Sequence, residues 1–141
     1  MEPDELVSTY VDDSPLEGLV APRYDGYSIV EVVASIYSSF GVDVKARESR
    51  LLGSSELSGA SNVAVVVVDA LGYFQLVEKG GKALREILEG GAELIPATTV
   101  APSTTAAALA SLATASYPGQ HGVLGFVLWL KELGTVATTL G

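Results

Sequence analysis

The sequence predicts an α/β fold, a layered and mostly parallel sheet with flanking helices, and three segments lead to this prediction. Residues 63–68 are all apolar and end in four consecutive valines, which is typical of a strand buried on both faces of a parallel sheet. Residues 28–40 and 105–115 carry helical patterns before and after this strand. Because strand and helix patterns alternate, we expect the helices to cover the faces of the sheet.

The helix over 28–40 has recognisable signals at both ends. Ser28 and Glu31 form the Ser-x-x-Glu capping box, and Gly41 provides a stop at the C-terminal end. The apolar residues of this segment recur at helical spacing on one face, namely Ile29, Val32, Val33, Ile36, Tyr37 and Phe40.

The other segments carry weaker signals. Residues 1–20 are acidic and lack periodicity, which predicts an irregular lead-in to a domain over 21–141. Between the main elements we expect a linker with one short helix at 45–62, a helical segment at 73–89 split near Gly80–Gly81, a second strand at 92–95, and a strand or short helix at 123–140.

Composition limits the classes of partner. The chain has 141 residues, of which 48% are hydrophobic and 18% charged, as in a globular domain. Its net charge of −9 argues against nucleic acid or an anionic membrane as a partner. Without cysteine there is no disulfide and no thiolate metal site, and the N-terminus lacks the basic region of a signal peptide. A cytoplasmic location is therefore the expectation.

Asp69 directly follows the valine strand. Ligands bind beyond the carboxyl ends of strands in open α/β sheets, so this carboxylate is a candidate site residue. The alternative is that Asp69 caps the helix that follows, since aspartate is a preferred N-cap residue.

Three hydroxyls, those of Ser103, Thr104 and Thr105, stand at the start of the alanine-rich helix. Ser103 or Thr104 can cap this helix, which is the common use of such residues. Thr105 can then point outward as a nucleophile, next to free amides and a positive dipole end that hold a phosphate. A threonine hydroxyl needs activation, and with no histidine near it in the sequence a metal is the better candidate.

His121 is the only histidine and lies in a turn, Pro-Gly-Gln-His-Gly. We expect an imidazole that stabilises the turn through backbone hydrogen bonds, in preference to a catalytic or metal-binding role. Asp25 is expected to be a turn residue. The glycine pairs at 80–81 and 90–91 follow helical segments, so they are not a dinucleotide fingerprint.

Three blocks together resemble the alkaline phosphatase superfamily, in the branch of type I phosphodiesterases and nucleotide pyrophosphatases. Residues 65–72 resemble the first core strand with its metal-binding aspartate, here Asp69. Residues 102–105 resemble the nucleophile motif, with Thr105 at the nucleophile position. Residues 117–125 resemble the segment after the nucleophile helix, and the order of the blocks agrees with the family.

The resemblance covers about residues 20–140 and implies an alkaline-phosphatase-like fold and hydrolysis of phosphodiesters or nucleotide pyrophosphates. It implies two divalent metal ions, zinc or manganese, with Asp69 and Thr105 as ligands. Thr105, as a metal-bound alkoxide, attacks phosphorus, and metal-activated water then cleaves the phosphothreonine. The oxygens of the two side chains are expected roughly 4–6 Å apart, at the carboxyl end of a central strand. In this family the histidine of the third block is structural.

The resemblance also implies that the site is incomplete. Two metals need further aspartates and two histidines, whereas the chain has one histidine in a different motif. We therefore expect the N-terminal portion of a longer enzyme, or a truncated product, with exposed apolar surface that favours self-association. The alternatives are a non-catalytic domain for binding or assembly and another superfamily enzyme such as a phosphomutase. The chain departs from the family pattern at two positions. Ala108, three residues after the nucleophile position, stands where the animal branch has an asparagine, and Ala115 stands where a glycine commonly precedes the Tyr-Pro block.

Overall fold

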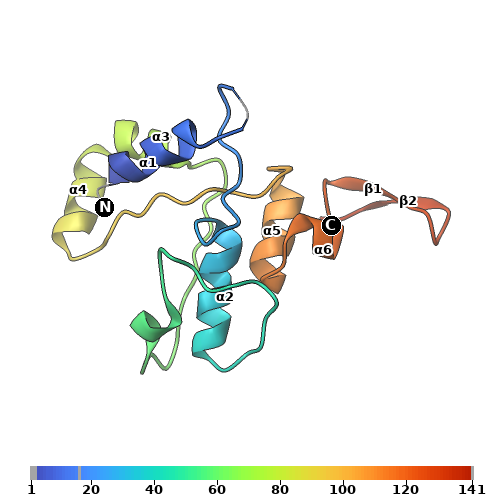
Figure 1. Cartoon of the computed structure of the whole chain (residues 1–141), viewed down its shortest axis with the longest axis horizontal. Coiled ribbons are helices and arrows are strands. Elements are labelled where there is room, and N and C mark those ends of the chain that lie inside the picture. The colour runs from blue at the N-terminus through green and yellow to red at the C-terminus, as the bar shows by residue number, and fades with distance from the viewer. Residues whose placement is uncertain (1–2, 16, 141) are drawn as a thin grey trace.

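The structure, a computed structural model, describes residues 3–15 and 17–140. Helices α2 and α5 lie side by side at the centre, α1, α3 and α4 lie to one side, and a β-hairpin projects from the other (Figure 1). The chain thus combines helices with a small sheet. The elements are α1 (Pro3–Asp12), α2 (Ile29–Ser39), the 3-10 helix η1 (Ser54–Leu57), α3 (Tyr73–Lys79), α4 (Gly81–Glu89), α5 (Thr105–Thr114), α6 (Pro118–His121), β1 (Val127–Leu130) and β2 (Thr135–Thr138).

Helix α2 forms as its sequence predicts. Ser28 is the N-cap, and both bonds of the capping box with Glu31 are present. Gly41 follows the helix with a φ of 76°, a left-handed conformation that glycine adopts without strain. The α2 face packs against α5 and the chain before it, forming a core of Val30, Val33, Ala34, Ala46, Val100, Ala107 and Ala115.

Glu31 also connects α2 to the segment after α5. Its carboxylate is fully buried and accepts hydrogen bonds from the Ser28 backbone N–H at 3.1 Å, from the Ser28 hydroxyl, and from Tyr117 Oη at 2.8 Å. Burial, followed by the contact with Glu31, raises the pKa of Tyr117 to about 12. The phenol therefore remains a hydrogen-bond donor at neutral pH.

The prediction of a buried central strand over 63–68 is wrong for this structure. The segment has no regular secondary structure and belongs to no β-ladder, and no residue in the described ranges is hydrogen-bonded to its backbone. Val65, Val66, Val67 and Val68 are 54%, 83%, 53% and 58% exposed. A strand exists only through pairing with a neighbour, and this segment has none to pair with here. The four valines are defined below as the valine segment.

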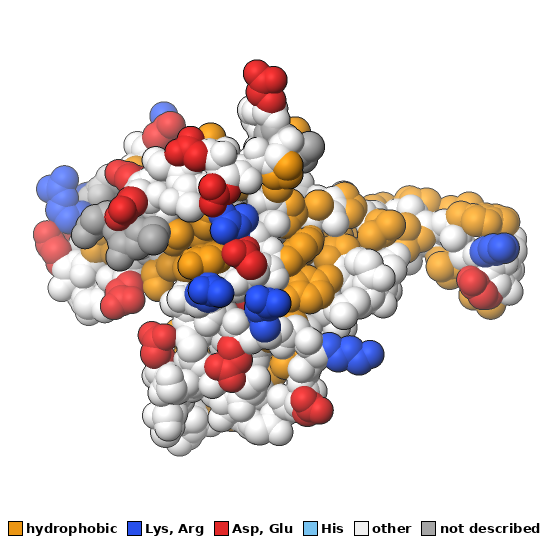
Figure 2. Space-filling model, viewed as in Figure 1, with side chains coloured by type: hydrophobic (Ala, Val, Ile, Leu, Met, Phe, Trp, Pro, Cys, Tyr) orange, Lys and Arg blue, Asp and Glu red, His pale blue; other side chains and the backbone are white. Residues whose placement is uncertain are grey.

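The parallel sheet is likewise not observed. Within residues 3–15 and 17–140 the sheet consists of β1 and β2, which pair antiparallel with Val127 opposite Thr138. The expected strand at 92–95 does not form, and the nearest pairing is a single parallel bridge between Ser28 and Thr98. The hairpin of β1 and β2 occupies the region 123–140, for which the sequence predicted either a strand or a short helix. The exposed side chains of the hairpin are largely apolar (Figure 2).

The N-terminal segment is helical where an irregular lead-in was expected. Helix α1 buries Leu6 and Tyr10 on one side, which explains why its otherwise polar sequence folds. Tyr10 Oη donates to the Pro96 carbonyl at 3.1 Å. Two other local expectations are confirmed: η1 is the short helix within 45–62, and the helical segment over 73–89 is split into α3 and α4 at Gly80.

Candidate active site

Thr104 is the N-cap of α5, and its side chain makes two bonds. Its Oγ1 accepts from the Ala107 N–H at 3.2 Å and donates to the Leu124 carbonyl at 3.0 Å. Thr104 has extended backbone angles, as N-cap residues do. Of the two hydroxyls that could cap this helix, Thr104 therefore does so, and the hydroxyl of Thr105 has no part in the cap.

Thr105 faces Asp69 across a gap of 36 residues in the sequence. Its Oγ1 donates to Asp69 Oδ2 at 3.3 Å, and both side chains are exposed to solvent. Asp69 Oδ1 accepts from the Ala70 N–H at 3.0 Å. Asp69 is not a helix cap, because α3 begins only after its N-cap Gly72. The two oxygens lie closer than the expected 4–6 Å.

The start of α5 also presents free backbone donors. Thr104 satisfies the amides of Ala107 and Ala108, through its side chain and its carbonyl. The amides of Thr105 and Ala106 have no hydrogen-bond partner within the described residues. Unpaired amides at a helix N-terminus attract anions, so an anionic group placed beside the Thr105 hydroxyl can be bound by both.

The donor set of this site fits part of a metal centre. A carboxylate and a hydroxyl are both oxygen ligands, and ligands at about 2.0–2.2 Å from a tetrahedral zinc lie about 3.4 Å apart. The observed 3.3 Å between Asp69 Oδ2 and Thr105 Oγ1 is close to this spacing. No group of three or more His, Cys, Asp or Glu side chains suited to a metal is present in the part of the chain that the structure describes.

His121 makes two hydrogen bonds within the protein. Its Nδ1 accepts from the Val123 N–H at 3.0 Å, and its Nε2 lies 2.9 Å from Ser111 Oγ. Loss of solvent lowers the pKa of the imidazole. The sequence predicted a bond between this ring and backbone but gave no sign of Ser111, which is one serine in an alanine-rich helix.

Ala115 ends α5 in the left-handed conformation, with a φ of 47° and a ψ of 42°. Glycine is favoured there because a side chain crowds the backbone in this conformation. The structure thus gives a physical reason why glycine is common at this position, and the alanine found here adopts a conformation that glycine would adopt without strain. Asp25 is a turn residue, as expected, and lies outside the site. Arg23 donates to both carboxylate oxygens of Asp25 at 3.1 Å, and this contact holds the pKa of Asp25 below the usual range.

An apolar pocket of about 570 Å³ lies beside the residues that lead into α5. Its walls include the segment from Pro96 to Ser103, together with Tyr73 and Phe74 from α3 and Tyr10 from α1. The rings of Tyr73 and Phe74 meet edge to face, with centroids 5.6 Å apart.

An exposed threonine hydroxyl at a helix N-terminus, facing a carboxylate, is an arrangement suited to hydrolysis of phosphate esters. The model of the family "type I phosphodiesterase / nucleotide pyrophosphatase" matches residues 63–139, more than half of the chain. The chain belongs to this family, whose members are hydrolases that generally depend on metal ions. The match includes Asp69, Thr105 and His121.

No curated protein and no solved structure matches the chain. In the described ranges, no helix combines the length and apolar character needed to cross a bilayer.

Proposed function

We propose that the chain carries the nucleophile half of a metal-dependent phosphodiesterase or nucleotide pyrophosphatase site, with Thr105 as nucleophile and Asp69 as metal ligand. The proposal depends mainly on one observation, the 3.3 Å contact between Thr105 Oγ1 and Asp69 Oδ2 at the start of α5. Family membership supports the reaction class.

In the proposed reaction, Thr105 Oγ1 releases its proton to solvent and attacks phosphorus in line, the bond from phosphorus to the leaving alcohol or phosphate breaks, and the leaving oxygen takes up a proton from solvent where it needs one. Water then hydrolyses the phosphothreonine. The free amides of Thr105 and Ala106 stabilise the equatorial oxygens, which gain negative charge as the attack proceeds. Asp69 Oδ2 and Thr105 Oγ1 would hold a divalent cation, zinc or manganese, whose charge would make the threonine hydroxyl more acidic.

The apolar pocket beside Ser103 supports a substrate with an apolar or aromatic part. Tyr73 and Phe74 offer ring faces and edges at a short distance in sequence from Asp69. We therefore propose that the organic group of the phosphate ester occupies this pocket, while its anionic part lies at the start of α5.

We further propose that the remaining metal ligands come from polypeptide outside these 141 residues. The support is the valine segment, whose backbone donors and acceptors have no partner among residues 3–15 and 17–140 and whose side chains are exposed. A strand pattern of this strength is typically covered on both faces, and additional strands beside it would also bring further side chains to Asp69.

The same observation favours one alternative function. A domain with an unpaired extended segment and exposed apolar surface can act in assembly without catalysis. The two readings differ in metal binding, because an assembly module has no requirement for a divalent cation at Asp69.

The test uses a longer polypeptide that continues past Gly141, beside the 141-residue chain. With zinc or manganese the longer polypeptide should hydrolyse a chromogenic phosphodiester, and mass spectrometry of the quenched reaction should find the covalent adduct on Thr105. The 141-residue chain should be nearly inactive, because one carboxylate and one threonine cannot hold two metal ions. Full activity of Thr105→Ala, or an adduct on another residue, would move the nucleophile elsewhere.

A further inference from the structure

The hydrogen bonds of His121 determine which of its nitrogens carries the proton. Because the Val123 N–H donates to Nδ1 at 3.0 Å, this nitrogen is unprotonated. The neutral ring therefore carries its hydrogen on Nε2 and donates it to Ser111 Oγ at 2.9 Å. Ser111 is fully buried within α5. His121 thus joins the middle of α5 to the turn over 122–125.

The same turn reaches the first residues of α5. Leu124, the neighbour of Val123, accepts the hydrogen bond from Thr104 Oγ1 at 3.0 Å. Thr104 in turn caps α5 through the Ala107 amide, and Thr105 follows it with its hydroxyl on Asp69. A continuous series of contacts therefore runs from the imidazole to the proposed nucleophile.

We propose that His121 is a positioning residue for Thr105. In its neutral form it holds the turn against α5, so that the Leu124 carbonyl fixes Thr104 in the cap and the Thr105 hydroxyl faces Asp69. A proton on Nδ1 removes the acceptor of the Val123 N–H, and the turn then loses its hydrogen bond to His121 and is held to α5 only through Thr104 and Leu124 among the described contacts. The inference rests on the proposed role of Thr105, but its test below requires no hydrolysis.

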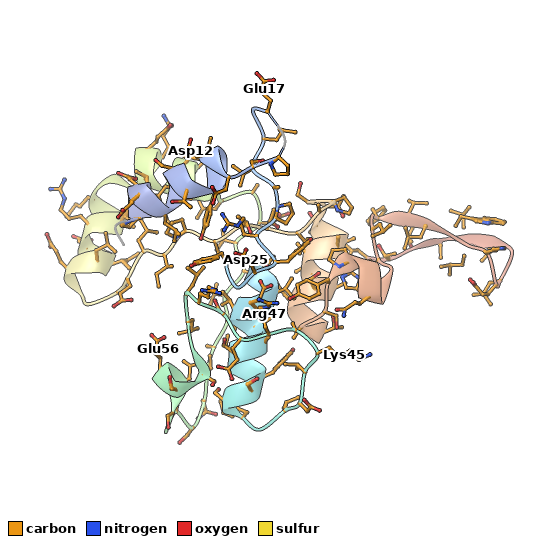
Figure 3. All side chains as sticks on the ribbon, in the orientation of Figure 1. Asp12, Glu17, Asp25, Lys45, Arg47 and Glu56 are labelled. Atoms are coloured by element: carbon orange, nitrogen blue, oxygen red, sulfur yellow. The ribbon has the colours of Figure 1, made fainter. Side chains whose placement is uncertain are left out.

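The surroundings of the ring contain few charges that could mimic this effect. The segments 105–114 and 118–126 hold no Asp, Glu, Lys or Arg. Loss of solvent is the cause of the lowered pKa of His121. Two acidic groups on neighbouring elements already have partners: Glu31 on α2 is hydrogen-bonded to Ser28 and Tyr117, and Asp69 is hydrogen-bonded to Thr105. The other charged groups on neighbouring elements are Lys45 and Arg47 on the loop after α2 (Figure 3), and Lys131 and Glu132 between the strands.

The first experiment is an NMR titration of the 141-residue chain, in which a single histidine makes the ring signals unambiguous. At pH 8 the ring nitrogens should show the Nε2–H tautomer. On acidification, the amide signals of Val123, Ala107 and Thr105 should shift with the midpoint of His121 protonation, below its ordinary pKa of 6.5. In His121→Asn, whose side-chain oxygen can still accept from Val123, these shifts should disappear.

Two outcomes overturn the proposal. One is the Nδ1–H tautomer at pH 8. The other is an unchanged pH-dependent shift of the Thr105 amide signal in His121→Asn, which would assign the effect to a group other than His121. Neither outcome depends on catalysis, so a failure here is distinct from a failure of the proposed nucleophile.

A second measurement, hydrogen exchange read by mass spectrometry, tolerates self-association. Ser111→Ala removes the acceptor of the Nε2–H, whereas the matched variant Ser116→Ala removes a hydroxyl whose one partner among the described residues is the nearby Thr114 carbonyl. Exchange at Val123 and Ala107 should become several-fold faster in Ser111→Ala alone. Equal exchange in the two variants would show that His121 does not hold the turn.

Discussion

The two adjacent threonines at the start of α5 should respond in opposite ways to the same substitution. Thr104→Ala removes the cap on the Ala107 amide, which costs about 1 kcal/mol, and the bond to the Leu124 carbonyl, which adds about 0.5–1 kcal/mol. The expected loss in unfolding free energy is therefore about 1.5–2 kcal/mol. Catalysis in the longer polypeptide should fall only in part, since Thr105, the proposed nucleophile, is retained.

Thr105→Ala should have the reverse effect. The Thr105 hydroxyl is exposed and its bond to Asp69 is 3.3 Å long, so its loss costs little. Alanine also has the higher helix propensity, and the unfolding free energy should stay within about 0.5 kcal/mol of the parent. Turnover of a phosphodiester should be abolished, because the proposed covalent intermediate on Thr105 could not form.

Urea unfolding followed by circular dichroism measures the first quantity, as a shift of the midpoint at an unchanged slope. Thr104→Ser keeps the cap oxygen and is the matched control, with stability close to the parent. Equal destabilisation by Thr104→Ala and Thr105→Ala would refute the reasoning, because the Thr105 hydroxyl would then be a structural group.

Three further expectations concern stability and association. Glu31→Gln should lower the unfolding free energy by about 1–3 kcal/mol, because the buried Glu31 carboxylate accepts hydrogen bonds from three donors. In the same urea assay the control Glu56→Gln should cost less than about 0.5 kcal/mol, because Glu56 caps η1 at an exposed position. We expect the chain to self-associate through the valine segment, so the substitution Val66→Lys, at a position that is 83% exposed, should shift its sedimentation toward that of a monomer. If Leu133→Lys, at a 71% exposed position of the hairpin, dissociates the chain instead, the hairpin is the associating surface. Because folding lowers the pKa of His121 from 6.5, the unfolded chain binds a proton that the folded chain does not as the pH drops below 6.5. The unfolding free energy measured with urea should therefore fall as the pH is lowered below 6.5. The same dependence of the unfolding free energy on pH in His121→Asn would contradict this explanation.

Local signals predicted the helices well. The capping box at Ser28 and Glu31 and the hydroxyls before α5 act within one turn of helix, so the sequence alone contains them. Helix α1 was missed because only Leu6 and Tyr10 mark its buried side, although Pro3 and the acidic residues after it are a start signal.

The sheet could not be predicted in this way, because a strand depends on what pairs with it. The valine segment has the composition of a buried strand but no ladder in this structure. The hairpin of β1 and β2 was left open because its turn lacks the asparagine–glycine or aspartate–glycine pair that marks two-residue hairpins.

For the candidate site, spacing and order brought Asp69 and Thr105 together correctly, at a shorter distance than expected. The sequence could not show which hydroxyl caps α5, since Ser103 and Thr104 are both preferred cap residues. It also could not pair Ser111 with His121, because that contact depends on how the chain turns after α5.

The hydrogen bonds around α2 have a consequence for how the chain folds while it is being synthesised. Glu31 bonds Tyr117, the Ile29 amide bonds the Thr98 carbonyl, and Tyr10 bonds the Pro96 carbonyl, so the early residues depend on partners made much later. Contacts of such long sequence separation form slowly, since the intervening loop must close first. While a ribosome is still adding residues up to Tyr117, the valine segment has already emerged with no partner. Nascent chains should therefore need protection by a chaperone over this interval, and a ribosome-bound intermediate ending before Thr98 should be sensitive to protease throughout the part of the chain that lies outside the ribosome.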